Sequence, residues 1–504
     1  GLGILSAIMK ENGYTDVNLF DCTFYNSHAL YSPEERINKV AVRPYSFKDR
    51  KITLKETDML DDFTNMVDEY EPDLLAFSVV ENTWFIAELL LDCLKNKKAK
   101  TLIGGVFPTY APQIVINNSN VDYVCRGEGE EAMLTLVNSL SDGNVEQTKK
   151  IPNIWAKIDN NIYENEIESR ILLNDIPFPD WSLFEEQSLF RPMQGKIYKT
   201  IGIETQRGCP YTCTYCNSPS NNVVYKKETG SIFYRKKSLK ILEQELTHMV
   251  KLHKPEFIYF VVDTFLAMSD RELNDFADIY KDFKIPFWMN TRAETIDDSR
   301  AEILEDMNCL RINIGIEHGN PEFRKEVLSR AVTNETMLDA FKSCSGRNFV
   351  TVANSIIGLP GETRELIFDT INFNKALPDD IEATSAFAFT PYHGTALREI
   401  ALEKGYIPKD TICSLSVTQG SILSMPHLSA NEILDLQYFF SFYVKADEDE
   451  WDDIKYVEDN YRNEPKLLDE LKVKYEKKFF TKEFKDFRGA SDLVIDANDF
   501  SDLH

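Results

Sequence analysis

From Lys199 onward the sequence alternates short apolar runs with helix-like segments, and this alternation most constrains the fold. Helical segments expected at 238–251, 270–282 and 334–342 separate the runs, so each run and helix form one strand–helix unit. Six such units predict a partial parallel (β/α)6 barrel over residues 196–400, with reacting groups at the carboxyl ends of the strands. The expected strands are Thr200–Thr205, Phe257–Val262, Phe287–Asn290, Leu310–Ile316, Val350–Ile357 and Ala383–Phe389.

The first 145 residues alternate in the same way and predict an α/β domain with a doubly wound, Rossmann-like parallel sheet. Residues 146–195 contain four prolines and few periodic runs, so we expect a linker there. Residues 401–504 are acidic and are expected to be mostly helical, with helices at 431–444 and 465–475. In the first domain, strands are expected at 16–20, 73–80, 99–104 and 121–125, and helices at 3–12, 58–70 and 83–96.

Composition excludes several classes of protein. The chain has 504 residues, 43% of them hydrophobic and 27% charged, which is typical of globular domains rather than disordered or fibrous chains. Its net charge of −26 argues against nonspecific nucleic-acid binding, which depends on neutralising phosphates. The most apolar stretch, 74–91, is interrupted by Glu81, Asn82 and Glu88. No run therefore approaches the ~20 apolar residues that a membrane span needs.

The cysteines and the first residues indicate the compartment and the completeness of the chain. Nine scattered cysteines make a poor disulfide framework and favour a reducing, cytoplasmic location. The chain begins at Gly1 with no basic leader, and its first residues resemble the middle of a domain, so we expect an incomplete N-terminus. Six cysteines lie singly and are expected to be small buried hydrophobes: Cys22, Cys93, Cys125, Cys309, Cys344 and Cys413.

The other three cysteines form a C-x3-C-x2-C cluster directly after the first expected barrel strand. Cys209, Cys213 and Cys216 would bring three thiolates round one point on a single loop. Thiolates suit iron–sulfur clusters and zinc alike. A structural zinc site needs a fourth ligand; His248 and His253 are the candidates, but neither belongs to a partner motif. We therefore favour an iron–sulfur cluster in which one iron has no protein ligand.

With Tyr215 before the last cysteine, this cluster resembles the signature of radical S-adenosylmethionine (SAM) enzymes. The resemblance implies a 4Fe-4S cluster whose open iron holds the amino and carboxylate groups of SAM. One electron, from a donor such as flavodoxin or ferredoxin, would cleave SAM to methionine and a 5′-deoxyadenosyl radical, which abstracts a hydrogen atom. In such enzymes the protein positions the cofactors and substrate and shields the radical, while the cofactors carry out the chemistry.

Residues at the following strand ends resemble the family's SAM contacts. Asp263 lies where the loop that contacts the SAM amino group falls, although the GGE sequence is missing and a helix cap is the alternative. Glu317 matches the acidic residue that contacts the ribose, because a carboxylate can accept from both hydroxyls; a structural carboxylate is the alternative. The other residues that the resemblance assigns to SAM are Tyr215, Arg292, Gly315, Gly358 and Glu362.

Two histidines also lie in expected strand-end turns. His318 and His393 would face substrate or be exposed loop residues. His393 stands where the family's turn has proline, so it is a candidate for substrate choice.

The N-terminal domain resembles the cobalamin-binding domain found upstream of many radical SAM barrels. Open parallel sheets bind cofactors beyond the carboxyl edge of their strands. The resemblance assigns the Ser78 hydroxyl to cobalamin, together with Gly104 and Gly105, which leave room for the nucleotide tail. The Gly127 and Gly129 turn would present amides at a helix start. The alternative is a cofactor-free domain that only docks.

The sequence departs from the wider cobalamin pattern at the lower cobalt ligand. Asp21 is followed by Thr23 and Asn26 where that pattern has His and Gly, and His28 is a weak substitute. The radical SAM subgroup commonly lacks this histidine, and an unligated lower face would favour methyl transfer from the upper face.

Together these resemblances imply a cobalamin-dependent radical SAM enzyme that methylates an unactivated carbon through a 5′-deoxyadenosyl radical and methylcobalamin. The alternative keeps both cofactors but forms or rearranges rings without methyl transfer. A methylthiotransferase is disfavoured because the extra cysteines and basic module are missing. The fourth alternative is a zinc-binding interaction protein. The substrate stays open among small molecules, lipids, tetrapyrroles and peptides.

Overall fold

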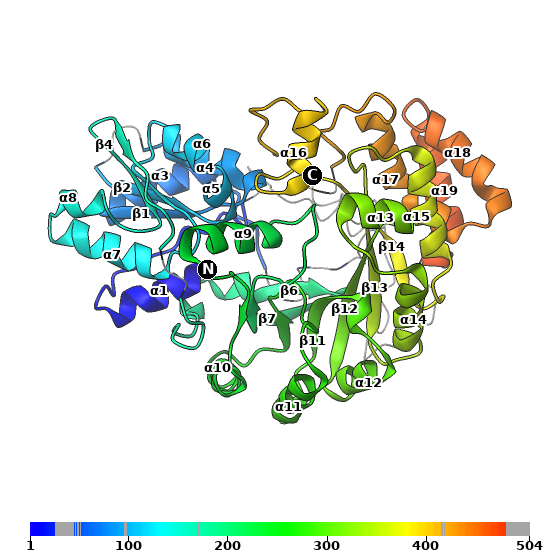
Figure 1. The fold of residues 1–504 in the computed structure, drawn as a ribbon, viewed down its shortest axis with the longest axis horizontal. Coiled ribbons are helices and arrows are strands. Elements are labelled where there is room, and N and C mark those ends of the chain that lie inside the picture. The colour runs from blue at the N-terminus through cyan, green and yellow to red at the C-terminus, as the bar shows by residue number, and fades with distance from the viewer. Residues whose placement is uncertain are drawn as a thin grey trace.

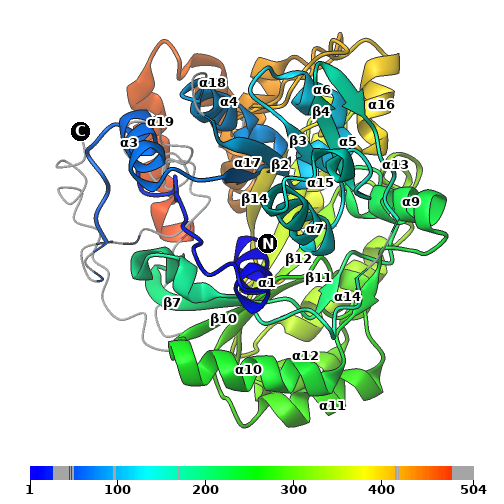
Figure 2. The same cartoon turned by 90° about the vertical axis from the view of Figure 1, so that its left-hand side faces the viewer.

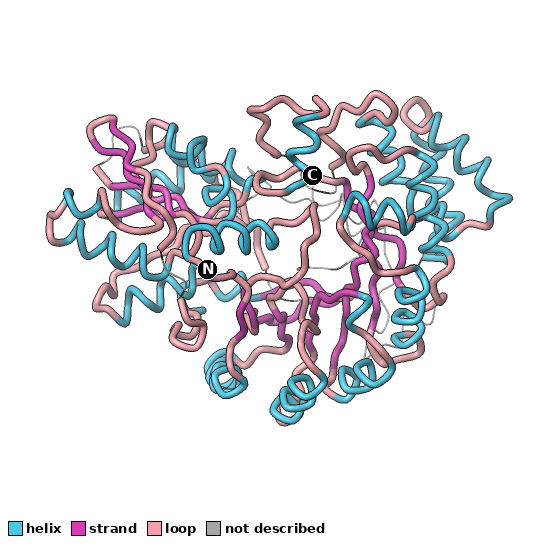
Figure 3. The backbone as a smooth tube through the Cα atoms, viewed as in Figure 1, coloured by secondary structure: helices cyan, strands magenta, loops and turns pink. Residues whose placement is uncertain are grey.

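The computed structural model describes residues 1–25, 52–94, 98–168, 171–414 and 419–479, together with residues 45, 47, 50 and 417. Two large sheets, each with its own helices, lie side by side (Figures 1 and 3). The predicted α/β class is confirmed, with an N-terminal sheet, a curled barrel sheet and a helical C-terminal region.

The N-terminal sheet has the strand order β1-β2-β3-β4-β5. Its first three strands are parallel, and β4 and β5 add to the β3 edge in antiparallel pairing. The strands are β1 (Leu74–Ser78), β2 (Lys100–Gly104), β3 (Tyr123–Cys125), β4 (Ile154–Ile158) and β5 (Asn161–Tyr163). The helices are α1 (Leu2–Glu11), α3 (Met59–Tyr70), α4 (Trp84–Asp92), α5 (Val106–Tyr110), α6 (Pro112–Asn117), α7 (Glu130–Ser141) and α8 (Val145–Thr148).

Two expectations for this half of the chain were wrong. Residues 16–20 form no strand, because no strand of the described residues pairs with them; Leu19 N donates locally to Asn18 Oδ1 instead. Within the expected linker, β4 and β5 belong to the N-terminal sheet, so that sheet continues past residue 145 to Tyr163. β4 buries three consecutive residues and β5 has only three residues, so neither strand shows an alternating pattern that the sequence could reveal.

The barrel sheet has the order β14-β13-β12-β11-β10-β7-β6, parallel except for the edge strand β6. All six predicted strands are present. The strands are β6 (Phe190–Met193), β7 (Lys196–Ile203), β10 (Phe257–Phe260), β11 (Phe287–Arg292), β12 (Cys309–Glu317), β13 (Val350–Ile357) and β14 (Glu382–Ala388). The helices are α9 (Ser218–Thr229), α10 (Leu239–His253), α11 (Asp270–Tyr280), α12 (Asp298–Asp306), α13 (Pro321–Leu328), α14 (Asn334–Cys344) and α15 (Arg364–Lys375).

Strand β12 shows how the sequence fixes the faces of this sheet. Ile312, Ile314 and Ile316 are fully buried in the main apolar core, whereas the residues between them are only half-buried. This alternation directs apolar side chains to the helix-covered outer face and leaves polar or small residues on the inner face. Figure 2 shows α10, α11 and α12 along the outer edge of the barrel, away from the N-terminal domain.

The C-terminal helices extend the barrel core. Helix α17 packs on β14 and α15 and buries Leu436, Phe439 and Phe440 completely. Its start is fixed by a capping box between Ser429 and Glu432. Of the helices in the described residues, none is long and apolar enough to cross a membrane. The helices of this region are α16 (Ala396–Glu403), α17 (Ala430–Lys445), α18 (Trp451–Asn460) and α19 (Pro465–Phe479).

Short elements carry several of the site residues. A two-stranded ribbon made of β8 (Gln206–Arg207) and β9 (Arg235–Lys236) flanks the cysteine loop. The single-turn 3-10 helices are η2 (Glu81–Thr83), η3 (Trp181–Leu183), η4 (Glu186–Leu189), η5 (Ala293–Thr295) and η6 (Glu448–Glu450).

Candidate functional site

The cysteine loop lies between the β8–β9 ribbon and the start of α9, at the carboxyl end of the first barrel strand. Two of its thiols are buried and the third is half-buried. Each thiol has a different polar neighbour. Cys209 Sγ lies 3.5 Å from Thr264 Oγ1, Cys213 Sγ lies 2.9 Å from Arg292 Nη1, and Cys216 Sγ accepts from Ser218 N at 3.4 Å.

The burial and the arrangement of the three thiols bear on which metal centre they could hold. Burial raises the pKa of Cys216 to about 12 and also raises the pKa of Cys209, so binding iron must displace protons. A zinc ion needs sulfur ligands at about 2.3 Å from one point. Within the described part of the chain, no group of three or more His, Cys, Asp or Glu side chains has such an arrangement. An iron–sulfur cluster therefore stays the assignment that the cysteine spacing favours.

Arg292, predicted to contact SAM, lies directly beside the cysteine loop. Its guanidinium packs over the Tyr211 ring at 4.0 Å and donates to Glu294 at 2.7 Å as well as to Cys213. A buried cation at this point offsets the negative charge that a cluster brings.

Glu317 is held in an unusual backbone conformation at the end of β12. Its φ of 65° is rare for a residue other than glycine, and such strain is common at functional sites. Glu317 Oε1 accepts from Arg330 at 2.8 Å and from Tyr215 at 2.9 Å. The carboxylate folds back over Gly315, where a Cβ would lie 2.1 Å from Oε1. Two predicted SAM residues, Tyr215 and Glu317, therefore meet beside the cysteine loop.

Arg330 completes this group and was not predicted from the sequence. It is 1% exposed and also donates to Gly315 O at 3.0 Å. Burial opposes its charge, but the Glu317 carboxylate raises the pKa of Arg330 above the ordinary value. Burial and Glu317 in turn raise the pKa of Tyr215, so the phenol stays neutral and donates to the carboxylate. In the sequence, Arg330 lies in a short segment between two helices, and an arginine there is expected to be exposed to solvent.

The remaining predicted SAM residues are not brought together with Glu317. Asp263 is exposed, accepts from Ser218 Oγ beside Cys216, and does not cap α11, whose N-cap is Ser269. Gly358 lies at the end of β13 with a φ of 75°, where a Cβ would lie 2.9 Å from Ile433. Both positions stay predictions as SAM contacts.

Glu362 and His318 form a buried pair instead of facing substrate. Both are 0% exposed, and His318 Nε2 lies 3.0 Å from Glu362 Oε1. Glu362 Oε2 accepts from Leu359 N at 2.9 Å, and the His318 ring stacks on Phe323. The expectation that His318 faces substrate or solvent was wrong. These contacts let Glu362 fix the turn after β13, while its predicted SAM contact stays untested.

The carboxyl edge of β1 and β2 carries the predicted cobalamin residues Ser78 and Gly104. They are direct partners in the ladder, and the Ser78 side chain is exposed. Gly105 follows with a φ of 118°, and a Cβ there would lie 2.3 Å from Val79 O. Val80 and Val106, the large side chains that follow the two strands, are 46% and 45% exposed. An apolar, open sheet edge of this kind suits a large flat cofactor.

The other predicted cobalamin glycines lie in a loop that faces the barrel. Gly127 N donates to Thr109 at 2.9 Å, and a Cβ at Gly127 would lie 2.5 Å from the Tyr225 hydroxyl of α9. The Gly127 amide is therefore already used within the protein, and its missing side chain serves domain packing. Gly129 precedes α7 without a comparable constraint. His28, the weak candidate for a cobalt ligand, lies outside the described residues.

Comparison with protein-family models decides the identity of both halves. Residues 203–373 match the Radical SAM superfamily, and residues 39–137 match the B12 binding domain. The chain belongs to the Radical SAM superfamily. This radical SAM enzyme carries an upstream B12-binding domain, so its cofactors are a 4Fe-4S cluster, SAM and cobalamin, as predicted from the sequence.

Relatives of this radical SAM enzyme differ in their reactions. It is 26% identical to an uncharacterized methyltransferase of Pyrococcus horikoshii over 76% of this chain and 81% of that protein. It is 24% identical to the anaerobic magnesium-protoporphyrin IX monomethyl ester cyclase of Rubrivivax gelatinosus, over 64% of this chain and 57% of that protein. The structure of the methyltransferase TsrM from Kitasatospora setae, 16% identical, matches 89% of this chain and 80% of its own with a TM-score of 0.55. That structural match shows a shared fold.

His393 joins the two domains of this radical SAM enzyme. Its Nδ1 lies 2.9 Å from Glu81 Oε1, and its backbone N donates to Glu81 Oε2 at 2.7 Å. Glu81 is 5% exposed and also accepts from Cys413 N at 2.9 Å. The expectation that His393 is an exposed loop residue was wrong. The sequence feature that could have revealed Glu81 is its position within the most apolar stretch of the chain, where a carboxylate needs a buried partner.

We expect Glu81→Ala to destabilise the contact between the domains by about 3 kcal/mol, because it leaves buried donors of His393 and Cys413 unpaired. Burial alone would raise the pKa of Glu81, but the bonds from His393 and Cys413 lower it. A lowered folded-state pKa stabilises the fold above the unfolded value of about 4.5 and stops doing so as pH falls through the folded pKa. The loss, measured by thermal unfolding, should therefore be largest near neutral pH and shrink in acid.

The exposed Glu146→Ala variant is the matched control, since the Glu146 side chain is 78% exposed in the same domain. Equal melting temperatures for the Glu81 and Glu146 variants would show that Glu81 does not hold the domains together.

Proposed function

We propose that this protein is a cobalamin-dependent radical SAM methyltransferase that methylates an unactivated carbon. One observation carries the proposal: buried contacts hold the open β1–β2 edge next to the strand-end loops of the barrel. Glu81, three residues after Ser78, binds the loop after β14 through His393. Substrate between these two regions would meet both cofactors.

The cofactors, when bound, supply hydrogen-atom abstraction at the cluster and SAM side and a transferable methyl group at the cobalamin side. In the proposal, Cys209, Cys213 and Cys216 hold the cluster. Glu317 accepts from the SAM ribose while Arg330 and Tyr215 fix its carboxylate. The further SAM contacts proposed are Asp263, Arg292, Gly315, Gly358 and Glu362, and those for cobalamin are Ser78, Gly104 and Gly105, with Gly129 at the neighbouring helix start.

The route for the electron is also part of the proposal. A groove of about 680 Å³ lies beside the cysteine loop, and Pro210 and Tyr211 of that loop line it. The Arg292 guanidinium packs on the Tyr211 ring and donates a hydrogen bond to the Cys213 thiol. A flavodoxin- or ferredoxin-like donor docked at this groove would be separated from the cysteine loop's Cys213 by the side chains of Tyr211 and Arg292.

The second candidate function is ring formation or rearrangement without methyl transfer. The similarity to the magnesium-protoporphyrin ester cyclase favours it, because that relative is named as a cyclase whereas the Pyrococcus protein is named as a methyltransferase. Both functions use the same cofactors, so the fate of the SAM methyl group distinguishes them.

A labelled methyl group tests the proposal without knowledge of the substrate. We expect anaerobically reconstituted protein, given reduced cobalamin and SAM with a deuterated methyl group, to move the label to the corrinoid and release S-adenosylhomocysteine. Mass spectrometry of the bound corrinoid is the measurement. Protein that binds cobalamin and produces 5′-deoxyadenosine, but never moves the label, would favour the second candidate. Reconstituted protein that retains iron but no cobalamin would contradict both.

A further inference from the structure

The β8–β9 ribbon places two arginines directly opposite each other. Arg207 and Arg235 are register partners in the two strands, and both are largely buried, with side chains 13% and 9% exposed. Like charges directly opposite on neighbouring strands destabilise a sheet. The ribbon therefore needs a carboxylate between the two guanidinium groups.

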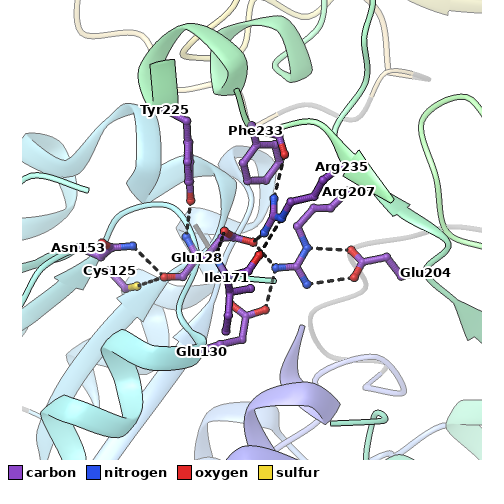
Figure 4. Close-up of polar contacts among 10 residues, drawn as sticks. All are labelled: Cys125, Glu128, Glu130, Asn153, Ile171, Glu204, Arg207, Tyr225, Phe233 and Arg235. Carbon is purple, nitrogen blue, oxygen red and sulfur yellow. Dashed lines mark hydrogen bonds and ion pairs between the residues drawn. The ribbon is translucent and has the colours of Figure 1, made fainter. Parts of the chain in front are cut away.

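That carboxylate comes from the N-terminal domain (Figure 4). Glu128 Oε1 accepts from Arg207 Nη1 and from Arg235 Nη2, and its side chain is 6% exposed. Arg207 has two further partners, Glu130 at 2.8 Å and Glu204 at 3.0 Å. Arg235, in contrast, has one ion-pair partner among the described residues, and that partner is Glu128.

The loop that carries Glu128 is itself fixed on both sides. Glu128 N donates to the Tyr225 hydroxyl at 2.9 Å, and Glu128 O accepts from Asn153 Nδ2 at 3.0 Å. Ile171 N donates to Glu128 Oε2 at 3.4 Å. The carboxylate therefore has one position, set jointly by the N-terminal sheet and by α9.

The ribbon leads straight into the cysteine loop. Arg207 is followed by Gly208, whose φ is 79° and where a Cβ would lie 2.8 Å from Phe233, and then by Cys209. Gln206, the other residue of β8, donates to Thr264 O at 2.5 Å, and Thr264 Oγ1 lies 3.5 Å from Cys209 Sγ. A movement of the ribbon would thus displace the first cysteine.

We propose that Glu128 is a positioning residue for the iron–sulfur cluster: the cobalamin domain, through the Glu128–Arg207–Arg235 contacts, fixes the ribbon that holds Cys209. This inference rests on the proposed cluster at the three cysteines, and it is independent of methyl transfer. It explains why Gly127 and Glu128 face the barrel instead of the β1–β2 edge.

The test compares two carboxylates that both join the domains, the buried Glu128 and the half-buried Glu228. Glu128→Gln keeps the side-chain volume but leaves the two arginines opposed. Glu228→Gln removes the 3.0 Å pair with Arg126, which also crosses between the domains but has no contact with Arg207. We expect reconstituted E128Q to lose iron to a chelator about tenfold faster than wild type and to show an altered EPR spectrum of the reduced cluster. E228Q should stay within about twofold with an unchanged spectrum.

Equal iron-loss rates and spectra in E128Q and E228Q would overturn the inference and reduce Glu128 to ordinary domain packing. If E128Q does not fold, Glu130→Gln replaces it, since that variant removes one of the three carboxylates around Arg207 and should give an intermediate rate. The measurements use neither cobalamin nor substrate. A wild-type protein without cluster would instead contradict the proposed function, so the two failures are distinguishable.

Discussion

Replacing Cys213 by alanine is expected to abolish the iron–sulfur cluster and with it all cleavage of SAM. Two thiolates remain in the variant, which cannot hold the cluster with the single open iron that SAM needs. The loss also leaves the buried Arg292 guanidinium, now 2.9 Å from the Cys213 thiol, without that partner. Iron and sulfide content after anaerobic reconstitution, together with 5′-deoxyadenosine formation, measures the effect.

Cys344→Ala provides the control for this experiment. Cys344 is 1% exposed and lies in the barrel core, so its loss costs packing without touching the cysteine loop. It should melt at a lower temperature but retain wild-type iron. A Cys213 variant that keeps its full iron content and cleaves SAM would show that the three cysteines of this loop are not the ligands of the cluster.

The strands and helices of the barrel could be predicted because their signal is local. Strands β7, β10, β11, β12 and β13 bury isoleucine, valine or phenylalanine, and helices such as α10 and α11 begin at a serine cap, so short stretches specify short elements. The cysteine spacing is equally local. The same reasoning failed at residues 16–20, where apolar alternation has no neighbouring strand to pair with, and at β4 and β5, whose pairing with β3 no local pattern records.

The residues that join distant segments could not be predicted. Arg330 meets Glu317 thirteen positions away, with helix α13 between them, and Glu81 meets His393 from another domain. Glu128 stands between Gly127 and Gly129, which the resemblance assigned to cobalamin, yet its carboxylate lies between two arginines of the barrel. A charged residue in a sequence is expected to be solvated, and only tertiary structure shows which ones are buried in pairs.

The Glu317→Gln substitution should have the second largest effect. Glutamine keeps the size of the side chain but removes the charge that faces Arg330, which is 1% exposed and 2.8 Å away. A lost hydrogen bond to a charged group is worth roughly 1.5–3 kcal/mol, so we expect SAM to bind about 10- to 100-fold more weakly. Equilibrium dialysis of SAM with reconstituted protein is the measurement, and unfolding curves report the cost of the unpaired arginine.

Tyr215→Phe separates the ribose contact from the support of the carboxylate. This variant removes the 2.9 Å bond to Glu317 and leaves the ion pair with Arg330 intact. The hydroxyl supports the carboxylate but does not itself bind the ribose, so only about 1 kcal/mol of SAM binding should be lost and the affinity should fall only about fivefold. If Glu317 is merely a structural carboxylate, E317Q will melt at a lower temperature yet bind SAM as tightly as wild type. If it accepts from the ribose, affinity will fall in both variants and far more in E317Q, because only that variant weakens the acceptor itself.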